Sequence, residues 1–288
     1  MSCPGELIAI DDTQLWVVER GPAGGYPLFV LHGGPGLDHH EFADYLDPLT
    51  DDDVRLLLVD QRAQGHSTPC DPSTWTLERM AQDVIMLALA MGLQRYGVLG
   101  HSFGAFVALQ NAIDYPGMAA QTILSSGVGS MRWLEEIDAQ LVSFEPVELR
   151  EQVRRSWERE SELTTVEEAD ALWRDQLPFQ FADPLDPRIT EYLERSADTV
   201  YVPDVLRTFA VEGYGGIEVE DRLDEVVQPV LVLAGRHDRT CVPAASEAIA
   251  SGIPGAELAI LESSGHMTFV EEPERYKALV GDFLKRTR

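Results

Sequence analysis

The chain has 288 residues, enough for one large α/β domain with an inserted layer of helices, and 44% of them are hydrophobic. It carries 22 Lys and Arg residues against 49 Asp and Glu residues, a formal net charge of −27. Nucleic acids and anionic membrane surfaces repel a protein of this charge, so neither is an expected partner. A cationic substrate such as a free amine fits the charge, and so does simple solubility.

The first residues and the cysteines bear on localisation. Residues 1–6 show neither the basic start nor the apolar run of a secretory signal, and no apolar stretch reaches the roughly 18 residues of a membrane span. Cys3, Cys70 and Cys241 have the spacing of neither a zinc site nor a disulfide framework. We therefore expect a cytoplasmic protein without a bound metal ion.

Predicted strands and helices alternate along most of the chain. Apolar, partly β-branched runs predict strands at 7–10, 15–19, 27–31, 54–59, 96–99, 121–125, 229–234 and 257–261. Helical spacing predicts helices at 76–91, 102–113, 243–251 and 273–285. The first two strands form a predicted hairpin, and the later alternation predicts an α/β fold with a mainly parallel eight-stranded sheet and helices on both faces.

The alternation stops between residues 129 and 225. This segment is charged, has helical patterns and no strong strand, and is interrupted by Pro146, Pro178, Pro184, Pro187 and Pro203. We expect residues 1–128 and 226–288 to form the core and residues 129–225 to form a helical cap. The cap should lie over the carboxyl ends of the strands, where α/β sheets bind ligands.

Gly-His-Ser-Phe-Gly at Gly100–Gly104 lies between the strand predicted at 96–99 and the following helix. A G-x-S-x-G sequence in this position is typical of a nucleophile elbow, the sharp turn that exposes a serine at the end of a strand. The flanking glycines leave room where Cβ atoms would crowd the turn. Ser102 is therefore the predicted nucleophile, and His101 is expected to pack beneath the turn.

Asp238 and His266 complete a predicted catalytic triad. Asp238 follows the seventh predicted strand and His266 follows the eighth, so both belong to the sheet edge that carries Ser102. A serine needs a general base, and that base needs an orienting carboxylate, here in the chain order Ser, Asp, His. The alternatives are a turn carboxylate for Asp238 and a surface histidine for His266. His237, beside Asp238, is expected to pack locally.

A glycine-rich loop at His32–Gly36, with the sequence His-Gly-Gly-Pro-Gly, follows the third predicted strand. Acyl transfer by a serine needs backbone N–H donors for the developing oxyanion, and such a loop can supply one. We predict that the N–H groups of Gly34 and Phe103 form the oxyanion hole, with Gly33 as the alternative to Gly34. His32 is expected to brace the loop through a backbone hydrogen bond.

Residues 60–67, Asp-Gln-Arg-Ala-Gln-Gly-His-Ser, follow the fourth predicted strand. Arg62 could bind the substrate. The favoured interpretation is a network between Asp60 and Arg62 that supports the glycine loop.

Together these motifs resemble the α/β-hydrolase superfamily and, more narrowly, the proline iminopeptidase family. The two motifs that are most specific for this family are the His-Gly-Gly-Pro-Gly loop at 32–36 and the sequence Asp-Gln-Arg-x-x-Gly-x-Ser at 60–67. The resemblance covers residues 28–126 and 230–288. It implies removal of an N-terminal proline or another small residue from peptides, without a metal or other cofactor, and cap carboxylates that hold the substrate amine.

The cap matches this family more loosely. Phe209–Tyr214 is similar to the segment that carries an amine-binding glutamate, which implies this role for Glu212. Ser156–Glu158 is similar to a Trp-Glu sequence of the family's cap, which implies a substrate contact for Glu158. Either glutamate could instead be solvated. Arg239 stands where some members have a glutamate directly after the catalytic aspartate.

The predicted function is that of a serine hydrolase acting through an acyl-enzyme on a small molecule or short peptide. An aminopeptidase is favoured, and a carboxylesterase or lactonase that uses the same triad on small esters is the alternative. The sequence leaves the oligomeric state open.

Overall fold

The computed structural model describes residues 5–288. The expectation that residues 1–6 carry no signal sequence therefore concerns mostly residues 1–4, which lie outside the described residues. Cys3 also lies outside them. Within residues 5–288, no helix combines the length and the apolar character needed to cross a membrane.

Eight strands form one sheet in the order β1-β2-β4-β3-β5-β6-β7-β8. Their bounds are β1 Glu6–Ala9, β2 Gln14–Arg20, β3 Tyr26–Leu31, β4 Val54–Asp60, β5 Gly97–His101, β6 Gln121–Ser125, β7 Val230–Gly235 and β8 Glu257–Leu261. β2 pairs antiparallel with both β1 and β4, and all other neighbours pair parallel. The predicted hairpin and the predicted mainly parallel sheet are confirmed.

Helices cover both faces of the sheet, because its central strands are apolar on both sides. In β3, Phe29 and Leu31 belong to one core cluster and Leu28 and Val30 to the other. One face packs on α1 (Leu77–Ala90), α2 (Phe103–Asp114) and α8 (Pro243–Gly252), and the other on α9 (Thr268–Glu271) and α10 (Pro273–Thr287). Short 3₁₀ helices are η1 His39–Phe42, η2 Asp47–Asp52, η3 Pro72–Thr74, η4 Met131–Trp133, η5 Glu160–Glu162 and η6 Glu220–Glu225.

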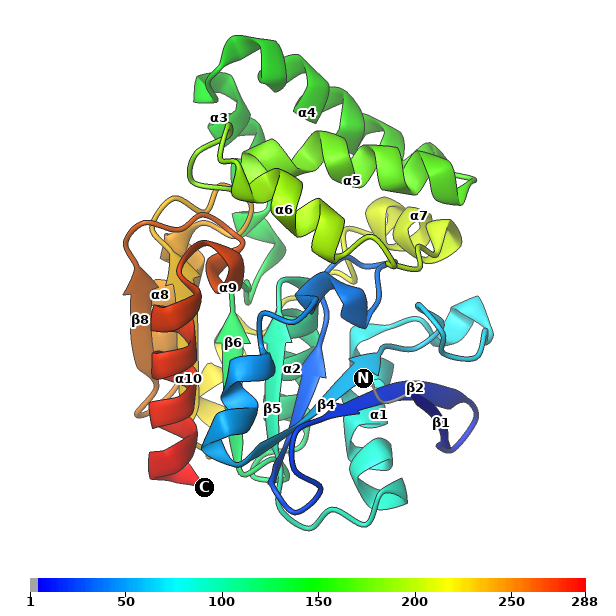
Figure 1. Cartoon of the computed structure of the whole chain (residues 1–288), viewed down its shortest axis with the longest axis vertical. Helices are drawn as coiled ribbons and strands as arrows, with labels where there is room; N and C mark the ends of the chain where they lie inside the picture. Colours follow the sequence, from blue (N-terminus) through cyan, green and yellow to red (C-terminus); the bar gives the residue numbers. More distant parts are fainter. Residues whose placement is uncertain (1–4) are drawn as a thin grey trace.

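Five α-helices fill the interval between β6 and β7. They are α3 Glu136–Ser143, α4 Val147–Arg159, α5 Val166–Gln180, α6 Arg188–Arg195 and α7 Pro203–Val211. We call α3–α7 the cap. Figure 1 shows the cap above the end of the sheet to which the arrows of the parallel strands point, with α6 and α7 nearer the sheet than α4. The site loops that follow β3, β5, β7 and β8 therefore meet beneath the cap.

Backbone hydrogen bonds tie the cap to these loops. The His266 N–H donates to the Gln180 carbonyl at the end of α5 (2.6 Å), and the Val202 N–H donates to the Gly36 carbonyl (2.9 Å). The ends of two cap helices are thus fixed to the loops that follow β8 and β3.

Candidate active site

Ser102 lies on the sharp turn between β5 and α2. Its backbone has φ 52° and ψ −120°, a strained conformation for a residue with a side chain. A Cβ at Gly100 would lie 2.1 Å from the Gly104 carbonyl oxygen, and a Cβ at Gly104 would lie 2.2 Å from the Leu31 carbonyl oxygen. Both positions therefore require glycine for steric reasons, and the turn has the shape that the sequence predicts.

His266 and Asp238 are hydrogen-bonded to each other. The distance between His266 Nδ1 and Asp238 Oδ2 is 2.8 Å, and both residues are buried. Asp238 Oδ1 accepts the backbone N–H groups of Thr240 (2.9 Å) and Cys241 (2.8 Å). The carboxylate is therefore fixed on one side by the chain and offers its other oxygen to the imidazole. Ser102 and His266 both line one pocket.

The glycine loop after β3 is braced by side chains beneath it. Within residues 5–288, the Gly34 and Phe103 N–H groups bind no protein acceptor, whereas the Gly33 N–H donates to Glu41 Oε2 (2.5 Å). Gly33 is therefore committed elsewhere, which leaves Gly34 and Phe103 as the candidate oxyanion donors. His32 braces the loop, with its Nδ1 2.8 Å from the Gly33 carbonyl oxygen.

The pocket beneath the cap holds about 770 Å³ of empty space, counting the part open to solvent. Most of its walls are apolar, with contributions from Phe103, Phe106, Leu134, Trp157, Trp173 and Leu206. Two carboxyl groups, those of Glu41 and Glu160, interrupt this surface. An apolar pocket with few polar groups is the usual form of a site for a small ligand.

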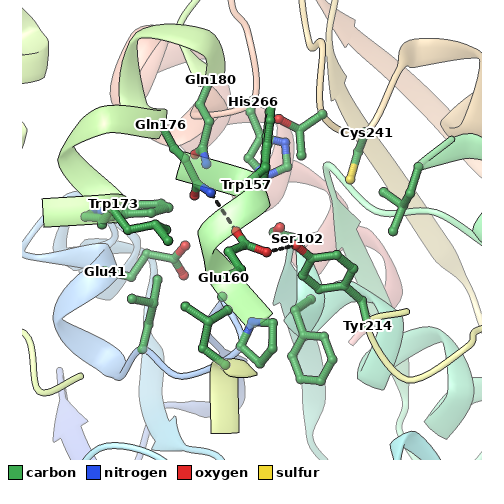
Figure 2. Close-up of a pocket in the computed structure, with 18 of the residues that line it drawn as sticks. Glu41, Ser102, Trp157, Glu160, Trp173, Gln176, Gln180, Tyr214, Cys241 and His266 are labelled. Atoms are coloured by element: carbon green, nitrogen blue, oxygen red, sulfur yellow. Dashed lines mark hydrogen bonds between the residues drawn. The ribbon is translucent and has the colours of Figure 1, made fainter. Parts of the chain in front are cut away.

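Glu160 enters the pocket from the end of α4. Figure 2 shows its carboxyl group pointing into the pocket, joined by dashed lines to Gln176 and Tyr214. Gln176 Nε2 donates over 2.6 Å, and the Tyr214 hydroxyl also donates to Glu160. Burial raises the pKa of Glu160 to about 7, although both hydrogen bonds oppose this shift. The group therefore exists in both protonation states near neutral pH.

The structure corrects the two glutamates that the resemblance implied. Glu158 is exposed and pairs with Arg154 on the outer side of α4, and Glu212 is exposed at the end of α7. Neither lines the pocket. Both segments do reach the pocket, but through Trp157 and Tyr214.

Helical geometry explains the first of these corrections. Residues three apart share a helix face, so Glu160 follows Trp157 into the pocket while Glu158 turns outward. This spacing identifies Glu160 only once Trp157 is known to face the pocket, and that contact is a long-range one.

Glu41 is a second buried carboxyl group, which sequence reasoning missed. It belongs to η1 and is 2% exposed. Burial raises its pKa to about 8, although the hydrogen bond from the Gly33 N–H lowers it. A Cβ at Gly33 would lie 2.6 Å from Glu41 Oε1 and 3.0 Å from the Ser102 Cβ, so Glu41 lies close to the glycine loop and to Ser102. At neutral pH the group is mainly a neutral acid.

Ionisation of Glu41 should reduce hydrolysis at alkaline pH, because a negative charge next to the glycine loop opposes a developing oxyanion. We expect kcat/KM for the neutral ester p-nitrophenyl acetate to fall about tenfold from pH 7 to pH 9, following a pKa of about 8. Glu41→Gln keeps an acceptor for the Gly33 N–H and cannot ionise, so its profile should lose this decline. The same decline in both proteins would assign it to another group.

The same substitution has a predicted effect on stability. The raised pKa of Glu41 means that the folded protein keeps this proton while the unfolded chain releases it, between about pH 4.5 and pH 8. Stability from this group is therefore present at low pH and is lost as the pH rises. Glu41→Gln has no such proton to lose. The difference between its Tm and the Tm of the original protein should therefore rise by at least about 3 °C between pH 5 and pH 9.

Arg62 lies away from the pocket, and its contacts correct the predicted network. Its guanidinium group binds Asp83 (2.7 Å) and Asp12 (2.8 Å) and makes no ion pair with Asp60. The glycine loop is instead supported from this segment by Gln64, whose Oε1 accepts the Gly36 N–H over 2.6 Å. Arg62 therefore fastens α1 to the hairpin.

Arg239, next to Asp238, fastens the cap. It donates to the carbonyl oxygens of Phe181 (2.7 Å) and Ala182 (3.0 Å), just after α5. Position 239 therefore supplies no carboxylate to the pocket. The nearby carboxyl group of Glu271 accepts the Gly265 N–H (2.8 Å) and braces the loop of His266 from below.

Comparison with known proteins agrees with the fold and the motifs. The sequence profile of the alpha/beta hydrolase fold matches residues 26–273. The chain belongs to the α/β-hydrolase family. It is a hydrolase, and it is 30% identical over 269 residues to a proline iminopeptidase of Heyndrickxia coagulans, with 91% of each chain covered.

Solved structures give the same fold. An alpha/beta fold family hydrolase from Bacillus anthracis matches with a TM-score of 0.81 and 24% identity, over 98% of this chain and 100% of that chain. A proline iminopeptidase from Mycobacterium smegmatis matches with a TM-score of 0.75 and 24% identity, over 98% of both chains. α/β-hydrolases with other activities share this architecture, so substrate preference has to be argued from the pocket.

Proposed function

We propose that this α/β-hydrolase is an aminopeptidase of the proline iminopeptidase type. It releases an N-terminal proline or another small residue from substrates that carry a free amine. The observation that carries the proposal is the carboxyl group of Glu160, which is buried in an otherwise apolar pocket that also contains Ser102 and His266. The similarity to curated proline iminopeptidases supports the same reaction class.

The proposed mechanism assigns one role to each residue of the triad. His266 accepts the proton of the Ser102 hydroxyl, and the serine oxygen attacks the carbonyl carbon of the substrate. Asp238 holds the imidazole through Nδ1 and stabilises its protonated form. His266 then protonates the leaving amine as the C–N bond breaks, which leaves the acyl group on Ser102. In the second half of the reaction, His266 takes a proton from the attacking water and returns it to Ser102 as the acyl group leaves.

The proposed oxyanion hole consists of the Gly34 and Phe103 N–H groups. These donors belong to two different segments that meet at Ser102, one before η1 and one at the start of α2. The start of α2 also presents the positive end of the helix dipole to the developing negative charge.

The proposed amine site is the carboxylate of Glu160. A substrate ammonium group that enters the pocket replaces the proton of this carboxyl group as its positive partner, so binding favours the ionised form. Gln176 and Tyr214 each donate to the carboxyl group and hold it in place. An apolar side chain or proline ring then lies against the aromatic wall. A desolvated carboxylate paired in this way discriminates against neutral ligands.

Glu160→Gln should selectively impair substrates with a free amine. A charge-assisted hydrogen bond contributes about 1.5–3 kcal/mol, so kcat/KM for proline and alanine p-nitroanilides should fall by about 10- to 150-fold. Hydrolysis of p-nitrophenyl acetate should change less than about threefold, because this ester has no ammonium group. Turnover of both substrate types is measured on the same preparations.

Matched controls are available on the same segments. Glu158→Gln lies on the outer side of α4 and Glu212→Gln at the exposed end of α7, so both should retain full activity on the anilides. Equal losses on anilide and ester in Glu160→Gln would make Glu160 structural. Rapid ester hydrolysis without any anilide turnover in the original protein would instead support a carboxylesterase or lactonase.

A further inference from the structure

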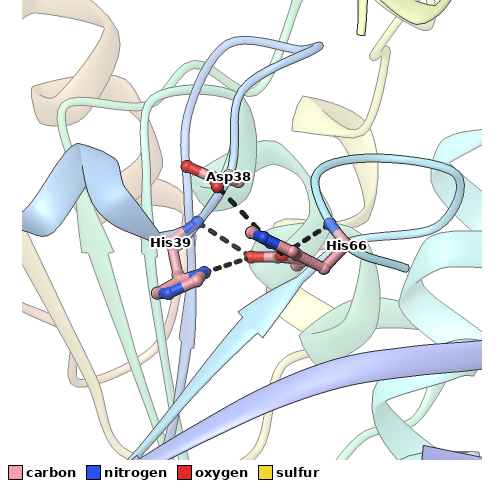
Figure 3. Close-up of side chains that lie close together, drawn as sticks. Asp38, His39 and His66 are labelled. Carbon is pink, nitrogen blue, oxygen red and sulfur yellow. Dashed lines mark hydrogen bonds and ion pairs between the residues drawn. The ribbon is translucent and has the colours of Figure 1, made fainter. Parts of the chain in front are cut away.

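Four side chains outside the pocket meet at the carboxyl ends of β3 and β4. Asp38, His39, Asp60 and His66, which we call the histidine–aspartate cluster, each place a nitrogen or oxygen atom within 4.8 Å of the others. Figure 3 shows Asp38, His39 and His66 gathered around one point between two loops. His39 Nδ1 lies 2.6 Å from Asp60 Oδ1, and His66 Nδ1 lies 3.0 Å from Asp60 Oδ2 and 3.7 Å from Asp38 Oδ2. None of the four residues lines the pocket of Ser102.

The charge balance of the cluster is unusual. The side chains of Asp38 and Asp60 are fully buried, and among residues 5–288 their ion-pair partners are histidines, with no Lys or Arg. Asp60 contacts His39 and His66, and Asp38 Oδ2 lies 2.8 Å from His40 Nδ1. Within the described part of the chain, two buried carboxylates thus lie in one cluster with no Lys or Arg beside them. Two carboxylates close together in the interior repel each other, so a divalent cation bound between them would stabilise both.

The ligand atoms also suit a particular class of ion. Two imidazole nitrogens and two carboxylate oxygens form a mixed set that zinc accepts in tetrahedral geometry, whereas Ca²⁺ and Mg²⁺ prefer six or more oxygen ligands. Zinc bonds of about 2.0–2.1 Å place tetrahedral ligands roughly 3.3 Å apart. One ligand atom from each residue lies within 4.8 Å of the other three, so an ion would enter as the side chains exchange their present hydrogen bonds for metal bonds.

We propose that the histidine–aspartate cluster is a binding site for one Zn²⁺ or a similar divalent transition-metal ion. Each histidine binds through Nδ1 in its neutral form, with its proton on Nε2, and an imidazolium that binds releases one proton to solvent. His66 is partly exposed and gives the ion a path from the surface. With four protein ligands the ion has no open position for catalysis, so its role is structural.

Such an ion would join three parts of the molecule. Asp38 and His39 lie just after the glycine loop, and Asp60 and His66 lie at and after the end of β4. Asp38 Oδ2 also accepts the Val200 N–H of the segment before α7, over 3.2 Å. Metal binding should therefore stabilise the folded protein by linking the glycine loop, the sheet and the cap.

The test uses the full chain, stripped with a chelator and titrated with ZnCl₂ in a calorimeter in the presence of excess Mg²⁺. The Mg²⁺ occupies weak sites on a protein with 49 acidic residues. We expect one strong site per chain and a rise in Tm on addition of zinc. Co²⁺ in place of zinc should give the intense visible absorption of a tetrahedral site. A weak octahedral spectrum would contradict the proposed geometry.

His66→Gln is the decisive variant, because a partly exposed side chain can be replaced without unfolding the cluster. Its affinity for Zn²⁺ should fall by at least about tenfold, and the zinc-dependent rise in Tm should disappear. The control is His237→Gln, an exposed histidine in the loop after β7, which should bind as the original protein does. Zinc affinity that is unchanged in His66→Gln, or no binding above the Mg²⁺ background in the original protein, would overturn the proposal.

Discussion

Ser102→Ala is expected to lower kcat/KM by about 10⁴-fold or more on both anilide and ester substrates. Loss of a triad nucleophile has effects of this size because the covalent intermediate can no longer form. The residual rate would come from the oxyanion hole and the bound water. The substitution removes one hydroxyl group and keeps the Cβ, so the strained turn at φ 52° is unchanged.

The measurement pairs turnover with covalent labelling and folding. A fluorophosphonate probe should label the original protein at Ser102 and leave Ser102→Ala unlabelled. Circular dichroism and Tm should be the same for both proteins, which separates loss of the nucleophile from loss of the fold. Substantial activity in a folded Ser102→Ala protein would mean that another group attacks the substrate.

The sheet and its site loops could be predicted from sequence because each depends on local patterns. The strands are continuous apolar runs, and each is bounded by turn residues. Gly100 and Gly104 follow from the steric limits of one tight turn. A Cβ at either position would lie about 2 Å from a backbone carbonyl oxygen. Asp238 and His266 follow from chain order, because parallel strands bring the loops at their carboxyl ends together.

The carboxyl groups of the pocket could not be found in the same way. Glu41 lies in the polar run Asp38–Glu41, which has the composition of a solvated loop, and only the packing of η1 against the sheet turns it inward. Glu160 directly follows the charged helix α4, and its orientation depends on hydrogen bonds from Gln176 of α5 and from Tyr214. Long-range contacts set both positions, and these leave little trace in a single sequence.

The same limit applies to pairing between charged side chains. Arg62 and Asp60 are two residues apart, and the sequence favours a contact between them. Residues two apart share a face of a strand, but β4 ends at Asp60 and the chain turns at Arg62, so Asp60 faces the histidines while Arg62 faces α1 and Asp83. Proximity along the chain therefore gave the wrong partner.

Asp238→Asn should test the orientation of the base, with an expected loss of about 10⁴-fold in kcat. The asparagine oxygen can still accept the Thr240 and Cys241 N–H groups, which would turn its amide NH₂ toward His266 Nδ1. Nδ1 must then act as an acceptor, so the imidazole carries its proton on Nε2 and cannot take the proton of Ser102. The protein should fold, because the polypeptide contacts of residue 238 are kept.

Glu271→Gln is the matched control for Asp238→Asn. Glu271 supports the same loop through the Gly265 N–H but does not contact the imidazole, so its substitution should lower kcat by less than about tenfold. The difference between the two variants isolates the tautomer of His266 from the stability of its loop. Asp238 would not be the residue that orients the base if Asp238→Asn kept nearly the original turnover and a variant at another carboxylate residue was inactive.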